Sequence, residues 1–257
     1  MINFRAATIS LLLLCPALVR ADDAPAPPPP QGVWLGKGQF GFVSSRGNSE
    51  AESINGNIDM LRYDGAWKNE LYLGGLYGRS SGVVSAQRGE TRSQSNYTVS
   101  GDLFAFGGLR YERDLFDGFQ YQASATAGMG YKFIDTNDTK LSGQIGAGYR
   151  RLRPEDIIKD ANGIVTSRVL HDATGEVIGT AGLDFSHAFN KSTTLTNKFL
   201  MEAGSSNTLL HDDLALTVKM SNQLSLSVGY GVTDNTNPPA TLKKLDTITT
   251  VNLVFAF

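Results

Sequence analysis

The chain has 257 residues, of which 9% are aromatic, and a formal net charge of −2 at pH 7. This length is sufficient for one large β domain. The near-neutral charge of mixed sign argues against a nucleic-acid partner, which would require a basic stripe. After residue 20 the chain has no run of about 18 apolar residues, so any membrane span would have to consist of strands.

Residues 1–21 are predicted to form a secretory signal peptide. Arg5 provides a positive charge, residues 6–14 are an apolar segment, and residues 19–21 fit a cleavage site. Cys15, the single cysteine, lacks the flanking residues of a lipoprotein signal. Cleavage near Ala21 would leave a chain without cysteine, so its stability must come from its sheet. Residues 22–33 are predicted to be a proline-rich periplasmic tail, which acts as an extended spacer or, alternatively, as a polyproline ligand for a partner.

Residues 34–257 show no helical periodicity, and apolar and polar residues alternate in about a dozen segments. The fold class predicted from this pattern is all-β, a transmembrane antiparallel up-and-down β-barrel of about 12 strands. The clearest segment is 119–133, where the odd positions are apolar with aromatic residues at both ends and the even positions are polar or glycine. The expected strands are 34–45, 50–63, 67–79, 91–100, 103–113, 119–133, 141–150, 177–186, 193–203, 214–221, 224–232 and 246–257.

The connections between these segments differ in length according to their order. With the N-terminus in the periplasm, every second turn is periplasmic and should be short. The expected short turns lie at 64–65, 101–102, 136–138, 190–192 and 221–223. The expected long extracellular loops are 80–90, 153–174, 204–212 and 234–244. Since the strand number is even, the last strand can pair with the first and close the sheet, as a bilayer requires.

The last strand ends in an apolar column of Val251, Leu253, Phe255 and Phe257. It resembles the C-terminal strand of bacterial outer-membrane barrels, which implies an assembly signal read by the outer-membrane assembly machinery. The predicted location is therefore the bacterial outer membrane, with outer-membrane lipid and lipopolysaccharide as further partners. A soluble ligand-binding barrel is the rival interpretation, in which the apolar face would point inward.

Four short motifs occur in order along the barrel domain. Gly47-Asn48-Ser49-Glu50 lies at the first hairpin, and it is followed by residues 76–79, 109–114 and 128–131. Together they resemble domain-of-unknown-function family 481, the salt-induced outer-membrane protein family, over residues 34–257. The resemblance implies an outer-membrane barrel of Gram-negative bacteria and a salt or osmotic role, and it implies no catalytic residue.

Nine charged residues are expected to face the lumen, and they carry both signs. Either they form the selectivity lining of a small polar pore, or they pair across the lumen and plug it. Twelve strands lie between the filled eight-stranded barrels and the open sixteen-stranded porins, so the strand number does not decide. The nine residues are Asp59, Arg110, Glu112, Lys132, Arg150, Asp184, Lys198, Glu202 and Lys219.

An enzyme on the barrel rim is a third interpretation. His171 and His211 are expected in outer loops and His187 at a periplasmic strand end, and the best local constellation is His211-Asp212-Asp213 beside Ser205 and Ser206. No nucleophile motif accompanies it, so no catalytic residue is predicted. Acidic residues at 155–156, 176 and 212–213 offer oxygen ligands without EF-hand or zinc spacing, so neither a metal site nor a cofactor is predicted.

The leading hypothesis is an integral, non-enzymatic outer-membrane barrel with a narrow polar lumen and a role in the cell envelope. The alternative is a porin-like channel, whose partner would be a small polar solute or ion.

Overall fold

The computed structural model describes residues 30–45, 51–116, 118–161, 164–238 and 243–257. These residues contain no helix that is long and apolar enough to cross a membrane. The predicted signal peptide, residues 22–29 of the predicted tail and the Gly47–Glu50 motif lie outside the described residues.

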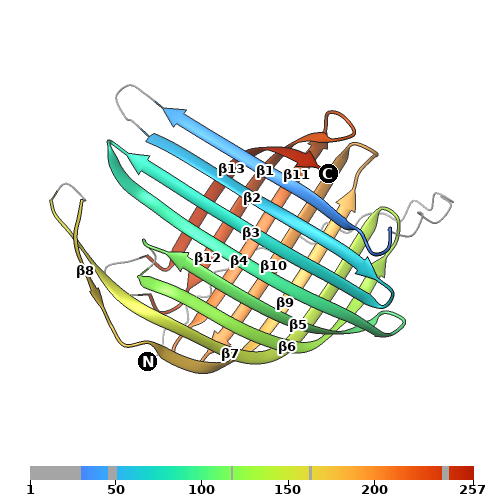
Figure 1. The fold of residues 1–257 in the computed structure, drawn as a ribbon, viewed down its shortest axis with the longest axis horizontal. Coiled ribbons are helices and arrows are strands. Elements are labelled where there is room, and N and C mark those ends of the chain that lie inside the picture. The colour runs from blue at the N-terminus through green and yellow to red at the C-terminus, as the bar shows by residue number, and fades with distance from the viewer. Residues whose placement is uncertain (1–29, 46–50, 117, 162–163, 239–242) are drawn as a thin grey trace, which may run out of the picture.

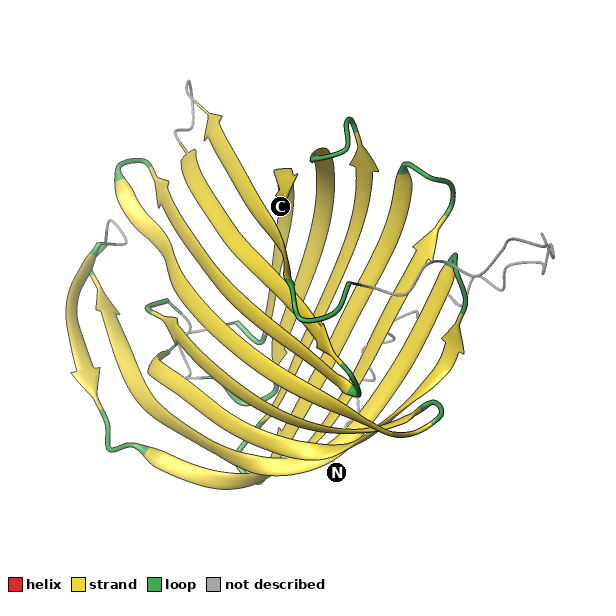
Figure 2. Ribbon diagram, turned by 45° about the vertical axis from the view of Figure 1, so that its right-hand side comes forward, coloured by secondary structure: helices red, strands yellow, loops and turns green. Residues whose placement is uncertain are grey.

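The described residues form thirteen strands, twelve of which close into an antiparallel barrel (Figures 1 and 2). Each barrel strand pairs with the next, β7 pairs with β9, and β13 pairs with β1. The predicted transmembrane up-and-down barrel is therefore confirmed. Strand β8 pairs only with β7 and extends outside the barrel wall. The strands are β1 (Trp34–Ser45), β2 (Ala51–Asp64), β3 (Trp67–Ser80), β4 (Val83–Ser100), β5 (Leu103–Asp114), β6 (Phe119–Asp135), β7 (Thr139–Lys159), β8 (Val165–Leu170), β9 (Thr174–Ala188), β10 (Thr193–Gly204), β11 (Thr208–Lys219), β12 (Leu224–Asn235) and β13 (Leu245–Ala256).

The outer surface of the barrel is apolar, because successive side chains on a strand point to opposite faces. On β6, Met129, Tyr131 and Phe133 are exposed, whereas Gln122 and Ser124 are buried toward the lumen. Exposed aromatic residues gather near both ends of the wall, and Trp67 and Tyr97 lie 4.9 Å apart, ring centroid to centroid, at one of them. An apolar band between two aromatic girdles is what a bilayer-spanning barrel presents to lipid. The rival interpretation, with the apolar face inside, is wrong for this structure.

One end of the barrel, here called the short-turn end, carries the five short connections that the sequence predicted. At Gly65 and Gly101 the backbone has φ of 58° and 53°, a conformation that glycine adopts without steric cost.

The opposite end, here called the loop end, differs from the prediction at three connections. Residues 83–90 belong to β4 and 208–212 to β11, so the predicted loops 80–90 and 204–212 shrink to tight turns. Most of the predicted loop 153–174 is a β-hairpin built by β7 and β8. At this end the strands are longer than a bilayer requires, and they therefore project beyond the membrane.

The closing seam between β1 and β13 is the shortest pairing in the barrel wall. Its register runs from Lys37 opposite Ala256 to Phe40 opposite Leu253. Two further backbone hydrogen bonds join the amide and carbonyl of Gly36 to those of Phe257, with N···O distances of 2.8 and 2.9 Å. The C-terminal residue is thus part of the closure, and the column from Val251 to Phe257 lies on the outer face.

Candidate functional site

All nine charged residues that the sequence assigned to the lumen occupy inward-facing positions in the strand register. Four of them belong to two ion-paired groups in the loop-end half of the lumen, centred on Arg110 and Arg150. The other five are Asp59, Lys132, Asp184, Lys198 and Lys219, of which Lys219 lies near the short-turn end.

The four residues in the two groups are Arg110, Glu112, Arg150 and Glu202, and the remaining five lie outside these groups. Of these five, only Lys132 makes an ion pair within the described part of the chain, with Asp135, at an N···O distance of 3.4 Å near the short-turn end. The two halves of the lumen therefore differ in how their charges are neutralised.

Arg110 on β5 is the centre of the larger group. Its Nε donates to Glu90 Oε1 at 2.8 Å and its Nη2 to Glu112 Oε2 at 2.5 Å. Its Nη1 donates to Glu202 Oε2 at 3.3 Å. Glu202 lies on β10, which is not a neighbour of β5, so this last ion pair crosses the lumen from one wall to another.

Further contacts complete this group. Arg88 Nε lies 2.7 Å from Glu112 Oε1, and Arg92 Nε lies 3.5 Å from Glu90 Oε1. Ser124 donates a hydrogen bond to Glu202 Oε1 at 2.9 Å. We refer to Arg88, Glu90, Arg92, Arg110, Glu112 and Glu202 as the Arg110 network. Its three arginines balance its three glutamates.

Water has little access to the centre of the Arg110 network. Arg110 is 8% exposed and Glu202 is 2% exposed. A cavity of about 70 Å³ lies next to them, lined by residues that include Gln94, Gln144 and Glu202. The two glutamines hydrogen-bond across strands that are not adjacent, with Gln94 Nε2 donating to Gln144 Oε1 at 3.1 Å. Side chains from β4, β5, β7 and β10 therefore meet across the lumen at this level.

The second group lies at the loop end and is centred on Arg150, which is 0% exposed. Arg150 Nη2 donates to Glu176 Oε1 at 2.5 Å and also contacts the side chain of Asn207. Glu176 additionally accepts hydrogen bonds from the hydroxyls of Ser205 and Ser206, at 3.0 and 2.7 Å. These contacts tie the turn between β10 and β11 to the wall formed by β7 and β9.

The predicted rim constellation around His211 is not assembled. His211 was expected in an outer loop, but it lies within β11 and faces the lumen, where its Nε2 is 2.9 Å from Arg110 Nη2. Asp212 faces outward and accepts a hydrogen bond from Asn197 at 2.6 Å. Ser205 and Ser206 contact Glu176 rather than a histidine. The error has one cause, because extending β11 to Thr208 moves His211 from a loop into the sheet.

The other histidines lie where the sequence placed them. His171 follows β8 at the loop end, with its Nε2 2.8 Å from Asp156 Oδ2, and His187 lies near the short-turn end of β9. The described residues bring no three of the side-chain types His, Cys, Asp and Glu together as a metal site. Two of the acidic candidates, Glu155 and Glu176, are instead paired with Arg168 and Arg150.

Sequence reasoning missed Arg88, Glu90 and Arg92. Residues 80–90 were assigned to a loop, so two of these charges received no orientation. The polar alternation of residues 88, 90, 92, 94 and 96 could have revealed the inner face of β4. The opposite face of the same segment carries Gln, Gly, Thr and Ser, so it lacks the apolar signal by which the other strands were recognised.

Comparisons with known proteins concern the whole barrel. A family model described as "Protein of unknown function, DUF481" matches residues 38–257. The uncharacterized protein YdiY of Escherichia coli (strain K12) is 23% identical over 228 residues, which cover 84% of this chain and 80% of that protein. Among solved structures, the COG4313 outer membrane channel from Pseudomonas putida F1 is 11% identical with a TM-score of 0.49, covering 93% of this chain and 100% of that chain. The translocator domain of the autotransporter NalP from Neisseria meningitidis is 14% identical with a TM-score of 0.48. This match covers 87% of this chain and 88% of that chain.

Proposed function

The chain belongs to the DUF481 family of proteins of unknown function, as its motifs predicted, and we propose that it is a non-enzymatic integral barrel of the bacterial outer membrane. In this proposal the barrel crosses the membrane but is closed to free diffusion by its own side chains. The apolar outer surface with its two aromatic girdles supports the membrane location. Export by the signal peptide at residues 1–21, with cleavage near Ala21, belongs to the same proposal.

The observation that carries the closed lumen is the ion pair between Arg110 and Glu202. It joins two walls of the barrel, and both side chains are almost entirely buried. Buried charges are tolerated when they are paired and hydrogen-bonded, and here three arginines meet three glutamates. An aqueous pore would instead leave such side chains exposed to water and separated by it.

The proposed role is maintenance of the envelope, with salt or osmotic stress as its physiological context. The context rests on the family resemblance of the sequence motifs, whereas the closed lumen rests on the geometry. A porin-like channel is the competing function, and the two differ in whether ions cross the wild-type barrel.

Recording of ionic current across a planar lipid bilayer distinguishes them. Under the proposal the wild-type protein gives no stepwise conductance, because the Arg110 network fills the lumen. Arg110→Ala should give steps that favour cations, since three carboxylates then face two arginines. Arg113→Ala, three residues away but on the outer face, is the matched control and should stay closed. Large wild-type steps that Arg110→Ala leaves unchanged would establish the channel instead.

A further inference from the structure

The outer wall of the barrel carries a row of glycines on three successive strands. Gly56 on β2 is opposite Gly75 on β3, which is opposite Gly89 on β4. All three occupy outward-facing positions. The same row begins with Leu253 and Phe40 and ends with Arg113 on β5.

These glycines leave open space rather than relieving close contacts. A Cβ atom added at Gly89 would meet no atom within 4 Å, and one at Gly56 or Gly75 would come no closer than 3.5 Å to a backbone oxygen. Side chains rise on both sides of the row, with Ile58 and Leu73 among those on one side. The row is therefore the floor of a groove about one residue wide.

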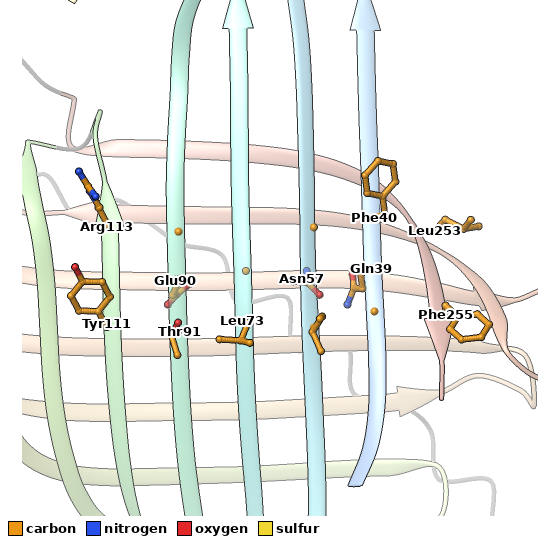
Figure 3. A pocket seen from close by; sticks show the side chains of 15 residues that line it. Gln39, Phe40, Asn57, Leu73, Glu90, Thr91, Tyr111, Arg113, Leu253 and Phe255 are labelled. Carbon is orange, nitrogen blue, oxygen red and sulfur yellow. The ribbon is translucent and has the colours of Figure 1, made fainter.

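Figure 3 shows a depression over this groove, which has a volume of about 800 Å³ and is lined by Gly56 and Gly89 of the row. Phe40, Leu73, Leu253 and Phe255 give it a mainly apolar lining. Arg113 and Tyr111 lie at one extremity of the view, and Leu253 and Phe255 lie at the other. From β1 to β5 the row crosses four strand spacings, or about 19 Å.

The groove runs obliquely through the membrane-facing surface, because the strands are tilted. Leu253 lies three residues before the end of β13, close to the short-turn end. Arg113 lies one residue before the end of β5, at the loop end. The apolar extremity is thus directed toward the membrane interior, and the cationic extremity toward the outer leaflet surface.

Arg113 belongs to a cationic and aromatic patch on three neighbouring strands. Tyr111 stacks on Tyr121 with ring centroids 6.2 Å apart. Arg153 is the register partner of Tyr121, and Arg151 is the partner of Ala123, which is itself opposite Tyr111.

Among the described residues, no acidic side chain is ion-paired with Arg113 or Arg151 of this patch. Both of these arginines are exposed. Arg153 donates from its Nε to the carbonyl of His171 at 3.2 Å. The nearby Glu155 and Asp156 are engaged by Arg168 and His171. The positive charge of this patch is therefore available to an anionic ligand.

We propose that the groove and this patch together bind lipopolysaccharide, with one acyl chain lying over Gly56, Gly75 and Gly89 and a phosphate at Arg113 and Arg151. Guanidinium groups bind phosphate oxygens with paired, charge-assisted hydrogen bonds, and tyrosine hydroxyls supply further donors at the headgroup level. An amphiphile with an anionic head matches a groove that is apolar along its length and cationic at one end. The site rests on the proposed outer-membrane location but is independent of whether the lumen conducts.

The test measures lipid binding to the full-length protein, extracted from membranes and stripped of lipid in detergent, by native mass spectrometry. The probes are lipid A with both phosphates, lipid A with the phosphates removed, and inorganic phosphate. Wild-type protein should bind phosphorylated lipid A at least tenfold more tightly than the phosphate-free form. Arg113→Ala combined with Arg151→Ala should abolish that preference, whereas Arg62→Ala, an arginine near the other end of the wall, should keep it.

A second pair of variants tests the groove. Gly89→Leu fills it and should weaken binding of both lipid A forms at least fivefold, whereas Gly179→Leu, at an equally open position on β9, should not. Heat-modifiable gel mobility identifies the folded barrel in every variant. The proposal is overturned if phosphate-free lipid A binds wild type equally well, if the arginine variants keep the preference, or if inorganic phosphate displaces the lipid. A closed or open lumen in the bilayer recordings leaves this result unaffected, so the two proposals fail separately.

Discussion

Arg110 and Arg113 lie three residues apart on β5 and have opposite surroundings. Arg110 points inward, is almost fully buried and contacts three glutamates. Arg113 points outward, is exposed and forms no ion pair with another described residue. The comparison shows that the inner surface around Arg110 neutralises its own charges, whereas the outer surface at Arg113 leaves a charge that we propose a ligand neutralises. The alternation of a single strand therefore separates a structural arginine from the one that we propose binds a ligand.

The glycines differ between the two surfaces in the same way. Gly128 on β6 faces inward, and a Cβ atom there would lie 2.1 Å from the carbonyl oxygen of Ile145 and 2.8 Å from the ring of Phe106. Gly89 faces outward into open space. Glycine thus permits close packing on the inside and leaves a groove on the outside.

The largest effect is expected from weakening the seam between β1 and β13, which closes the barrel and so separates its inner surface from its outer surface. Deleting Phe257 removes both backbone hydrogen bonds to Gly36 from a seam that is already short. We expect the amount of heat-modifiable barrel in the outer membrane to fall at least tenfold. Phe257→Tyr keeps the backbone and an aromatic ring, so its effect should be much smaller. Normal barrel levels in the deletion variant would contradict this role of the C-terminus.

The two arginines should differ clearly in their contribution to stability. Arg110→Ala leaves Glu90, Glu112 and Glu202 with reduced neutralisation, and we expect it to lower the free energy of unfolding by about 3 kcal/mol. Arg113→Ala should change it by less than about 0.5 kcal/mol. Urea-induced unfolding of the refolded protein in lipid vesicles measures both. Equal losses in the two variants would break the distinction between inner and outer arginines.

The two glycines provide a smaller contrast. Gly128→Val forces a branched side chain against the backbone of β7, and we expect a loss of about 2 kcal/mol in the same unfolding measurement. Gly89→Val should be neutral or stabilise by up to about 1 kcal/mol, since a strand glycine is replaced at an open position. A comparable loss at both positions would show that the outer row is needed for packing.

The smallest expected effect concerns a single hydrogen bond. Ser124→Ala removes the donor to Glu202 Oε1 and should cost about 1 kcal/mol. Ser93→Ala, at an outward-facing position of β4, is the control and should cost less. If Ser124→Ala leaves the free energy of unfolding unchanged, the hydrogen bond from Ser124 is not needed to stabilise Glu202.

The sequence predicted the barrel, its strand number and its inner and outer faces wherever the outer face is apolar. Residues 119–133 show this clearly, because their alternation carries aromatic residues at both ends. It found only residues 91–100 of β4 and assigned residues 83–90 to a loop, because the outer face of this segment holds Gly89 and Gln87 and so gives no apolar period. The glycine that hid this part of the strand also forms part of the groove.

The contacts inside the lumen were less accessible to sequence reasoning. Arg110 and Glu202 were both assigned to the lumen, but 92 residues separate them. Which inward charges meet depends on the stagger of the strands around the barrel, and alternation alone does not determine that stagger. His211 shows the same limit, because its position depended on where one strand begins.

The most direct measurement of the closed lumen is a charge exchange between Arg110 and Glu202, followed by single-channel recording. Arg110→Glu alone and Glu202→Arg alone should each open the barrel, because each leaves like charges facing one another across the lumen. The double variant restores three arginines against three glutamates, and we predict that it returns to the closed state of the wild type. If the double variant conducts as much as the single variants, the pairing of these two residues does not close the lumen.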